Sequence, residues 1–242
     1  MQKRNRLFVF TALLFVPAAS LLAQSTVDPS GHWTGTIQIP DREIRFTIDL
    51  AKNAKGELIG TFSNPQENLK GLPLRKITVE GKSIKFEGRV DQPFAGEISA
   101  DGKEILGGYT FENYSIPFSL KREGAAQIDQ PARIARIGKE LEGNWDGTVS
   151  ATGREIHVIL ALANRADGTA SGKLVDLSNG ELEIPVTAVT QTEANVAIEF
   201  KNLGSSYSAT LNQEKTELAG TYRQGEFSAP LTLRRRKSPT GE

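Results

Sequence analysis

The chain of 242 residues contains no cysteine and two histidines, and its 29 basic residues balance its 29 acidic residues. The missing cysteines exclude a disulfide scaffold, and the balanced charge gives no electrostatic reason to expect a nucleic-acid partner. Such a chain must be stable through its core, and it is long enough for one large or two small domains.

Residues 1–23 have the layout of a secretory signal peptide. The basic stretch "MQKRNR" precedes the apolar run "LFVFTALLFVPAASLLA", which contains Pro17 and ends in small residues. The pattern predicts cleavage after Ala23, and a secreted or periplasmic protein without membrane contact once the signal is removed. An uncleaved membrane anchor is the alternative. Cleavage would leave a net charge of about −3, which again favours no nucleic-acid partner.

Residues 29–122 form a series of short runs in which apolar and polar residues alternate. This two-residue period, with turn signals such as "NAKG" and "ADGK" between the runs, predicts about eight antiparallel strands. The inward phase carries aromatic side chains at Trp33, Phe46, Phe62, Phe86 and Phe118. Such a face either fills a core or lines an apolar ligand pocket, and these residues are therefore the pocket candidates of the first half.

Residues 123–140 differ in composition from the stretch before them. They are rich in alanine, polar and charged residues, and Pro131 interrupts them. We predict a linker, with a short helix over residues 131–141.

Residues 141–236 repeat the first pattern, and residues 237–242 form a tail. "GHWTGTIQIPDREIRF" begins at Gly31, and "GNWDGTVSATGREIHV" begins 112 residues later at Gly143. Further residues match at nearly the same spacing, including the prolines Pro73 and Pro185. The repeat predicts two homologous domains in tandem. By correspondence with the first copy, the pocket candidates of the second are Trp145, Ile198 and Tyr207.

Eight short strands joined by tight turns predict a closed barrel, because closure removes the two exposed edges of an open meander. The expected fold is therefore all-β, with two antiparallel eight-stranded up-and-down barrels joined by a partly helical linker. A flattened barrel or a two-sheet sandwich is the structural alternative. In a closed meander, the end of the last strand lies beside the start of the first. This places Arg122 over Trp33 and Arg235 over Trp145, where each pair would close its barrel.

The opening G-x-W and the closing arginine resemble lipocalin and avidin-like barrels. A more specific resemblance is to the accessory domain that precedes the catalytic domain of many secreted bacterial α/β-hydrolases. The first copy carries "GHWTG", "FSNPQENLKGLPL", "LGGYTF" and "IPFSLKR", and the second carries "GNWDG", "KLVDLSNGELEIPV", "LAGTYRQG" and "APLTLRR". Leu177 replaces Pro65 in the second copy, which departs from the family pattern. The chain contains no G-x-S-x-G, so the resemblance implies tandem accessory domains without the hydrolase domain.

The sequence offers little catalytic chemistry. His32 and His157 both fall on the outward phase, and neither has a cysteine or a second histidine nearby in sequence. We therefore predict no enzyme activity, no metal site and no cofactor. The leading hypothesis is a non-enzymatic protein that binds a small apolar or amphipathic ligand in one or both barrels. The alternative is a module that docks an exported protein or a glycan, with barrels filled by side chains.

Overall fold

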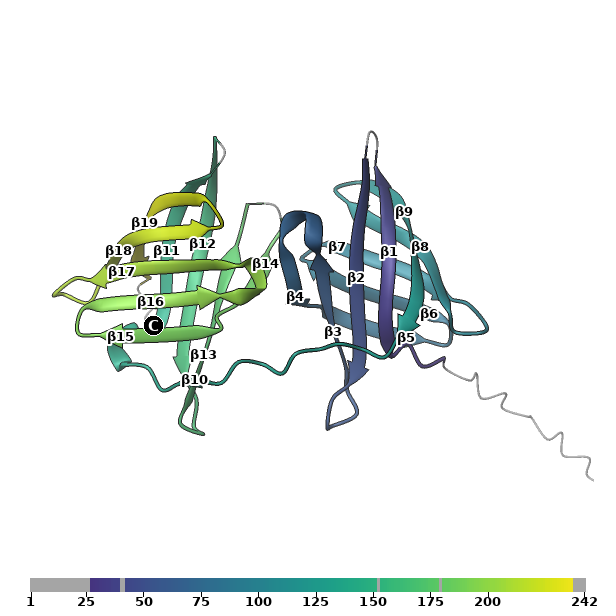
Figure 1. Ribbon diagram of the computed structural model, residues 1–242, viewed down its shortest axis with the longest axis horizontal. Coiled ribbons are helices and arrows are strands. Elements are labelled where there is room, and N and C mark those ends of the chain that lie inside the picture. Colours follow the sequence, from purple (N-terminus) through teal and green to yellow (C-terminus); the bar gives the residue numbers. More distant parts are fainter. Residues whose placement is uncertain (1–26, 40–41, 152, 179, 237–242) are drawn as a thin grey trace, which may run out of the picture.

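A computed structural model describes residues 27–39, 42–151, 153–178 and 180–236. These residues form an all-β protein of two nearly closed antiparallel barrels, which lie side by side (Figure 1). The two barrels correspond to the two sequence repeats. The expected signal peptide, residues 1–23, and the tail, residues 237–242, lie outside the described residues.

The first barrel is a nine-stranded sheet in the order β4-β3-β2-β1-β9-β8-β7-β6-β5. Its elements are β1 (Gly31–Ile39), β2 (Arg42–Lys52), β3 (Leu58–Asn64), the 3-10 turn η1 (Pro65–Glu67), β4 (Leu69–Pro73), β5 (Arg75–Glu80), β6 (Ser83–Arg89), β7 (Gln92–Ile98), β8 (Glu104–Phe111) and β9 (Tyr114–Gly124). The first and last strands pair with each other, as the up-and-down arrangement requires.

The second barrel is a ten-stranded sheet in the order β10-β13-β12-β11-β19-β18-β17-β16-β15, and β14 also pairs with β13. The linker supplies β10, which has no counterpart among the described residues of the first barrel. Its elements are β10 (Ile134–Ala135), the 3-10 turn η2 (Lys139–Leu141), β11 (Gly143–Ala151), β12 (Arg154–Asn164), β13 (Thr169–Asp176), β14 (Leu182–Pro185), β15 (Ala188–Thr192), β16 (Asn195–Phe200), the 3-10 turn η3 (Lys201–Leu203), β17 (Ser205–Leu211), β18 (Glu217–Gln224) and β19 (Phe227–Arg235).

Each repeat has nine strands rather than the eight expected. The additional strands are β4 and its counterpart β14, in stretches that read as loops because they are rich in polar residues, glycine and proline. The left-handed φ of Gly71, +63°, and the terminal position of Pro73 show how β4 accommodates these residues. Its pairing with β3 supplies order that local propensity does not.

The linker has no α-helix among its described residues, contrary to the short helix expected over 131–141. It contains the two-residue strand β10 and the 3-10 turn η2 instead. Ile134, Ile137 and Leu141 recur at a helix-like spacing, yet all three are buried against the core of the second barrel. Packing of an extended segment therefore satisfies the same apolar residues that suggested a helix.

Candidate functional site

The interior of the first barrel holds the aromatic candidates, and they pack against one another. Trp33 and Phe86 are fully buried, and Phe46 and Phe118 are nearly so. Phe94 lies among them, with its ring centroid 5.1–5.6 Å from those of Phe86, Phe118 and Phe46. Phe62 stacks on Phe46 at 5.7 Å and is partly buried. These distances are those of a packed aromatic cluster.

The candidates of the second barrel are also buried. Trp145 and Ile198 are fully buried and Tyr207 is 1% exposed. The Tyr207 hydroxyl lies 2.7 Å from the carbonyl oxygen of Leu218 and 3.0 Å from that of Leu231, so backbone acceptors satisfy it. Burial raises the pKa of Tyr207 well above its ordinary value. The phenol is thus a neutral hydrogen-bond donor inside the core.

One end of each barrel is covered by an arginine that lies over a tryptophan. The Arg122 guanidinium carbon is 4.6 Å from the centroid of Trp33, and the corresponding distance from Arg235 to Trp145 is 4.2 Å. Both are cation–π distances. Each arginine lies across from its tryptophan on a neighbouring strand, β9 beside β1 and β19 beside β11.

A large cleft lies between the barrels. This cleft has a volume of about 1100 Å³ and is lined by outer surfaces of both repeats and by the linker. Equivalent residues of the two copies face it, including Gly60 with Gly172, and Pro73 with Pro185. The repeat spacing pairs Pro73 with Pro185 but does not predict the cleft, because no pattern within one copy shows how two copies pack.

The linker runs from the first barrel to the second (Figure 1), and residues 127–132 and 134 line the cleft. It is held at both ends. At the first barrel, the buried Asp49 carboxylate accepts a hydrogen bond from the backbone N–H of Gln127 at 2.7 Å. The same oxygen lies 2.8 Å from Nδ1 of His32. At the second barrel, β10 pairs with the start of β13. His32, which has no partner obvious from the sequence, thus helps to hold a carboxylate that anchors the linker.

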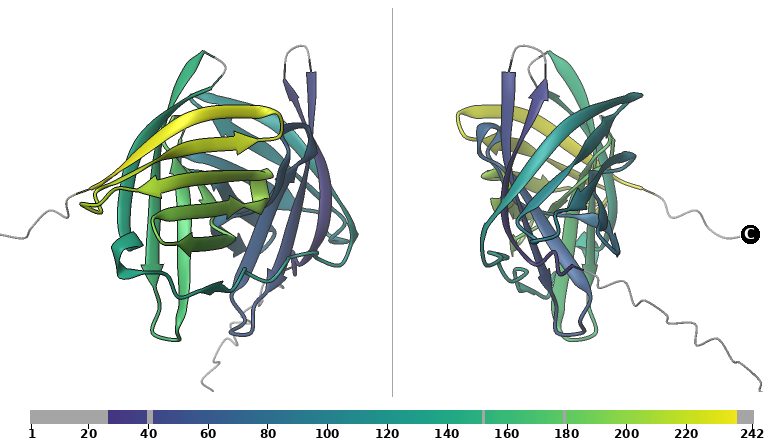
Figure 2. Two further views of the ribbon diagram at one scale, coloured as in Figure 1. Left: turned by 60° about the vertical axis from the view of Figure 1, so that its left-hand side comes forward. Right: turned by 90° about the vertical axis from the view of Figure 1, so that its right-hand side faces the viewer.

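The barrels also contact each other directly, through loops that correspond in the two copies. The Asn202 side chain in η3 donates to the carbonyl of Gly71 at 3.0 Å, and the Val90 N–H donates to the carbonyl of Glu181 at 3.2 Å. Leu72 of β4 is 2% exposed and belongs to the core of the second barrel. Figure 1 shows β4 and β14 between the barrels, and Figure 2 shows the two barrels turned by 60° and by 90° from that view.

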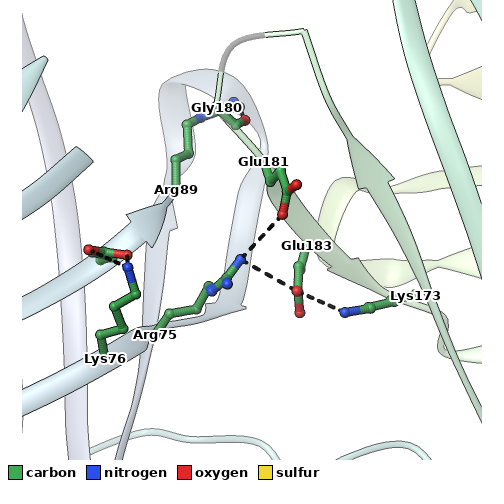
Figure 3. A network of polar contacts seen from close by, with 8 residues as sticks. Arg75, Lys76, Arg89, Lys173, Gly180, Glu181 and Glu183 are labelled. Atoms are coloured by element: carbon green, nitrogen blue, oxygen red, sulfur yellow. Dashed lines mark hydrogen bonds and ion pairs between the residues drawn. The ribbon is translucent and has the colours of Figure 1, made fainter. Parts of the chain in front are cut away.

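A network of charged groups extends this interface (Figure 3). Arg75 lies 3.4 Å from a carboxylate oxygen of Glu183 and 4.0 Å from one of Glu181. Lys173 approaches Glu183 to 2.8 Å, and the Arg89 guanidinium donates to the carbonyl of Gly180 at 3.5 Å. Because Arg75 is about one-third exposed, this network is partly screened by water, and its contribution is chiefly to fix the orientation of the barrels.

Within the part of the chain that the structure describes, no cluster of three or more His, Cys, Asp and Glu side chains could hold a metal ion. The carboxylate of Asp146 lies 2.9 Å from Nε2 of His157. None of the described helices is long and apolar enough to cross a membrane.

No protein-family model and no curated protein matches the chain. A solved structure from Bacteroides fragilis, described as a "putative outer membrane protein", is 14% identical over 86% of this chain and 97% of its own, with a TM-score of 0.26. A DUF3598-family protein of unknown function from Nostoc punctiforme is 12% identical over 88% and 97%, with a TM-score of 0.26. A heme-binding protein from Pseudomonas aeruginosa is 8% identical over 88% and 78%, with a TM-score of 0.18. Likenesses this weak carry no argument about fold or function.

Proposed function

We propose that this chain is a non-enzymatic, exported binding protein that holds an extended amphipathic ligand in the cleft between its two barrels. The observation that carries the proposal is the cleft itself, about 1100 Å³ between the two barrels, together with the interior of the first barrel, where the aromatic side chains pack on one another. Small-ligand sites typically measure about 300–1,000 Å³, so the cleft accommodates a drug-sized or longer molecule. Secretion or a periplasmic location is part of the proposal and is supported by the signal-like residues 1–23.

The lining of the cleft supports an amphipathic ligand with negative groups. Its apolar side chains include Leu58, Ile59, Leu74 and Ile77, and Ile59 is 39% exposed. Its charged side chains are Lys70, Lys76, Arg165, Lys201, Asp49 and Asp129. Asp49 is engaged by His32 and Gln127. Lys76 is paired with the buried Glu87 at 3.1 Å. Three basic side chains, of Lys70, Arg165 and Lys201, then remain against Asp129, so the balance is basic. A positive cleft raises the local concentration of anionic ligands.

The alternative hypothesis, a docking module with filled barrels, agrees with the aromatic cluster around Phe94 and with the resemblance to hydrolase-associated domains. The hypothesis of a small ligand inside a barrel needs open space in the interior. In the first barrel, the aromatic side chains that would line this space contact one another. Both hypotheses can place their ligand in the cleft, because a segment of a partner protein and a small molecule would contact the same lining residues.

The test combines a retained-ligand measurement with two matched variants. Native mass spectrometry of the exported protein should show added mass that is lost in Ile59→Asp, because the new carboxylate lies on the apolar lining. Leu106→Asp is the control, since Leu106 is 58% exposed on β8 and does not line the cleft. An environment-sensitive apolar dye should show the same difference. Equal binding by both variants would place the ligand elsewhere.

A further inference from the structure

The two barrels differ at the seam between their edge strands. In the second barrel, β10 of the linker pairs with β13 through Ile134 and Ala170, and it also contacts β15. Ile134 is 4% exposed and belongs to the core of this barrel. The linker therefore fills the seam with a short antiparallel strand that inserts one aliphatic side chain.

The first barrel has the same seam, between β3 and β5. The repeat spacing makes Leu58 the counterpart of Ala170 and Ile77 the counterpart of Val189. Among the described residues, none pairs with Leu58 on the side where β10 pairs with Ala170. Leu58 and Ile77 are only partly buried, and both line the cleft. The seam that is filled in one barrel thus opens onto the proposed binding cleft in the other.

The backbone of β3 is oriented to accept a strand there. Leu74 donates its N–H to the carbonyl of Gly60 at 2.8 Å, and Val186 donates to Gly172 in the same way at 2.9 Å. Because backbone groups alternate sides along a strand, the N–H and C=O of Leu58 point to the same edge as the carbonyl of Gly60. An extended chain at this edge would find one donor and one acceptor already aligned.

We propose that the ligand of the cleft is an extended polypeptide segment of a partner protein, which adds as an antiparallel strand to β3 at Leu58. The inference rests on the proposed function and names its ligand class. The segment places one aliphatic side chain between Leu58 and Ile77, as Ile134 is placed in the second barrel. Backbone pairing supplies affinity and the inserted side chain supplies specificity. The basic side chains of the cleft favour acidic residues beside the aliphatic one.

The probe is a synthetic peptide that copies residues 131–137, with acidic residues in place of its two arginines and the sequence PAEIAEI. Fluorescence anisotropy with the full chain should show saturable binding, tighter than that of the parent peptide PARIARI. Methylation of the amide nitrogen of the central isoleucine removes its backbone donor and leaves the protein untouched. We expect this change to weaken binding by about tenfold, the upper range for one hydrogen bond. Equal affinity of the methylated peptide would overturn strand addition.

Two further measurements separate the outcomes. Leu58→Pro removes the N–H at the open edge and should weaken peptide binding. Leu106→Pro is not a suitable control, because Leu106 is paired with strands on both sides and proline would disrupt that pairing. Hydrogen exchange at the Leu58 amide should be fast in the free protein and slow with peptide. Slow exchange without peptide would show that the chain itself fills the seam, and would refute the inference. If the dye binds in the cleft and no peptide competes, the proposed function stands and the peptide inference fails.

Discussion

At the scale of single residues, each barrel end depends on a tryptophan held by two kinds of contact. The Trp33 indole donates its N–H to the carbonyl of Pro29 at 2.9 Å, while Arg122 covers its face and donates to the carbonyl of Asp28 at 2.7 Å. The second barrel repeats the indole bond, from Trp145 to the carbonyl of Leu141. The arginine therefore joins the segment before the first strand to the end of the last.

Trp33→Ala should lower the free energy of unfolding by about 3–5 kcal/mol, because it leaves a large cavity in a core. Arg122→Ala should cost less, about 0.5–2 kcal/mol for the cation–π contact and a similar amount for its hydrogen bond. Urea unfolding followed by tryptophan fluorescence measures the arginine variant, and circular dichroism measures the tryptophan variant. A larger loss for Arg122→Ala than for Trp33→Ala would contradict this account.

Gly107 lies where neighbouring strands leave no space for a side chain. A Cβ added at this position would overlap the backbone carbonyl of Ala95 on β7, and its repeat counterpart Gly220 is equally close to Ser208. Gly107→Ala should therefore destabilise the first barrel by about 1–3 kcal/mol. Gly88→Ala is the matched control, because no atom lies within 4 Å of its added Cβ. Similar unfolding midpoints for the two variants would show that the strands separate without cost.

The buried tyrosines predict an alkaline limit of stability. Burial raises the pKa of Tyr207, Tyr109 and Tyr222 in the folded state above the ordinary value of 10.0. The unfolded chain then loses these protons first, so stability is complete below about pH 10 and decreases as the pH rises further. Tyr207→Phe should cost about 1 kcal/mol at pH 7 and reduce the alkaline loss. Urea midpoints at pH 7 and above pH 10 test both effects.

At the scale of elements, alternation identified the strands that have one buried and one exposed face. The register of β1 with β2 and of β8 with β9 is regular. The predicted inward residues Trp33, Phe46 and Phe118 of β1, β2 and β9 lie in the core. β4 escaped detection because its order comes from its neighbours: Leu72 is buried in the other barrel. The cleft was equally out of reach, since it depends on the packing of two copies and not on the pattern within one.

The linker is an element whose function is anchorage. Asp49→Ala removes the acceptor that holds Gln127 and His32, and it should free the first half of the linker while β10 stays paired. We expect faster hydrogen exchange at Gln127 and a loss of about 1–3 kcal/mol, the range for a hydrogen bond to a charged group. Asp129→Ala, which changes an exposed carboxylate of the same linker, is the control. Unchanged exchange at Gln127 would show that other contacts fix the linker.

At the scale of the whole molecule, the repeat explains the reciprocal contacts between barrels. The loop after β3 in the first copy lies on η3 of the second, and the loop after β13 lies on the loop after β6. These loops correspond to each other in the two copies, so the same kind of contact is made twice. The two barrels therefore contact each other as the two subunits of a symmetric dimer do, with each kind of contact made twice.

The two barrels should therefore fold separately and still stabilise each other. Fragments 25–125 and 130–242 each carry a full strand set, and the second keeps β10, so each should unfold cooperatively. The 130–242 fragment lacks Leu72, whose side chain fills part of its core in the intact chain. Loss of a buried leucine typically costs about 2–5 kcal/mol, so this fragment should unfold at a lower temperature than the corresponding barrel in the full protein.

Mixing the fragments should restore part of the difference, because the reciprocal loops and Leu72 can dock without a covalent link. The midpoint of 130–242 is expected to rise with the concentration of 25–125, as for any ligand that binds only the folded state. Leu72→Asp in the first fragment should abolish the rise, since it would bury an unpaired carboxylate, whereas Leu106→Asp should preserve it. If the unfolding midpoint of 130–242 does not change with the concentration of 25–125, Leu72 does not stabilise the second barrel across the interface. Failure of both fragments to unfold cooperatively would instead reject the two-domain organisation, and the inter-barrel cleft would then be the interior of a single folding unit.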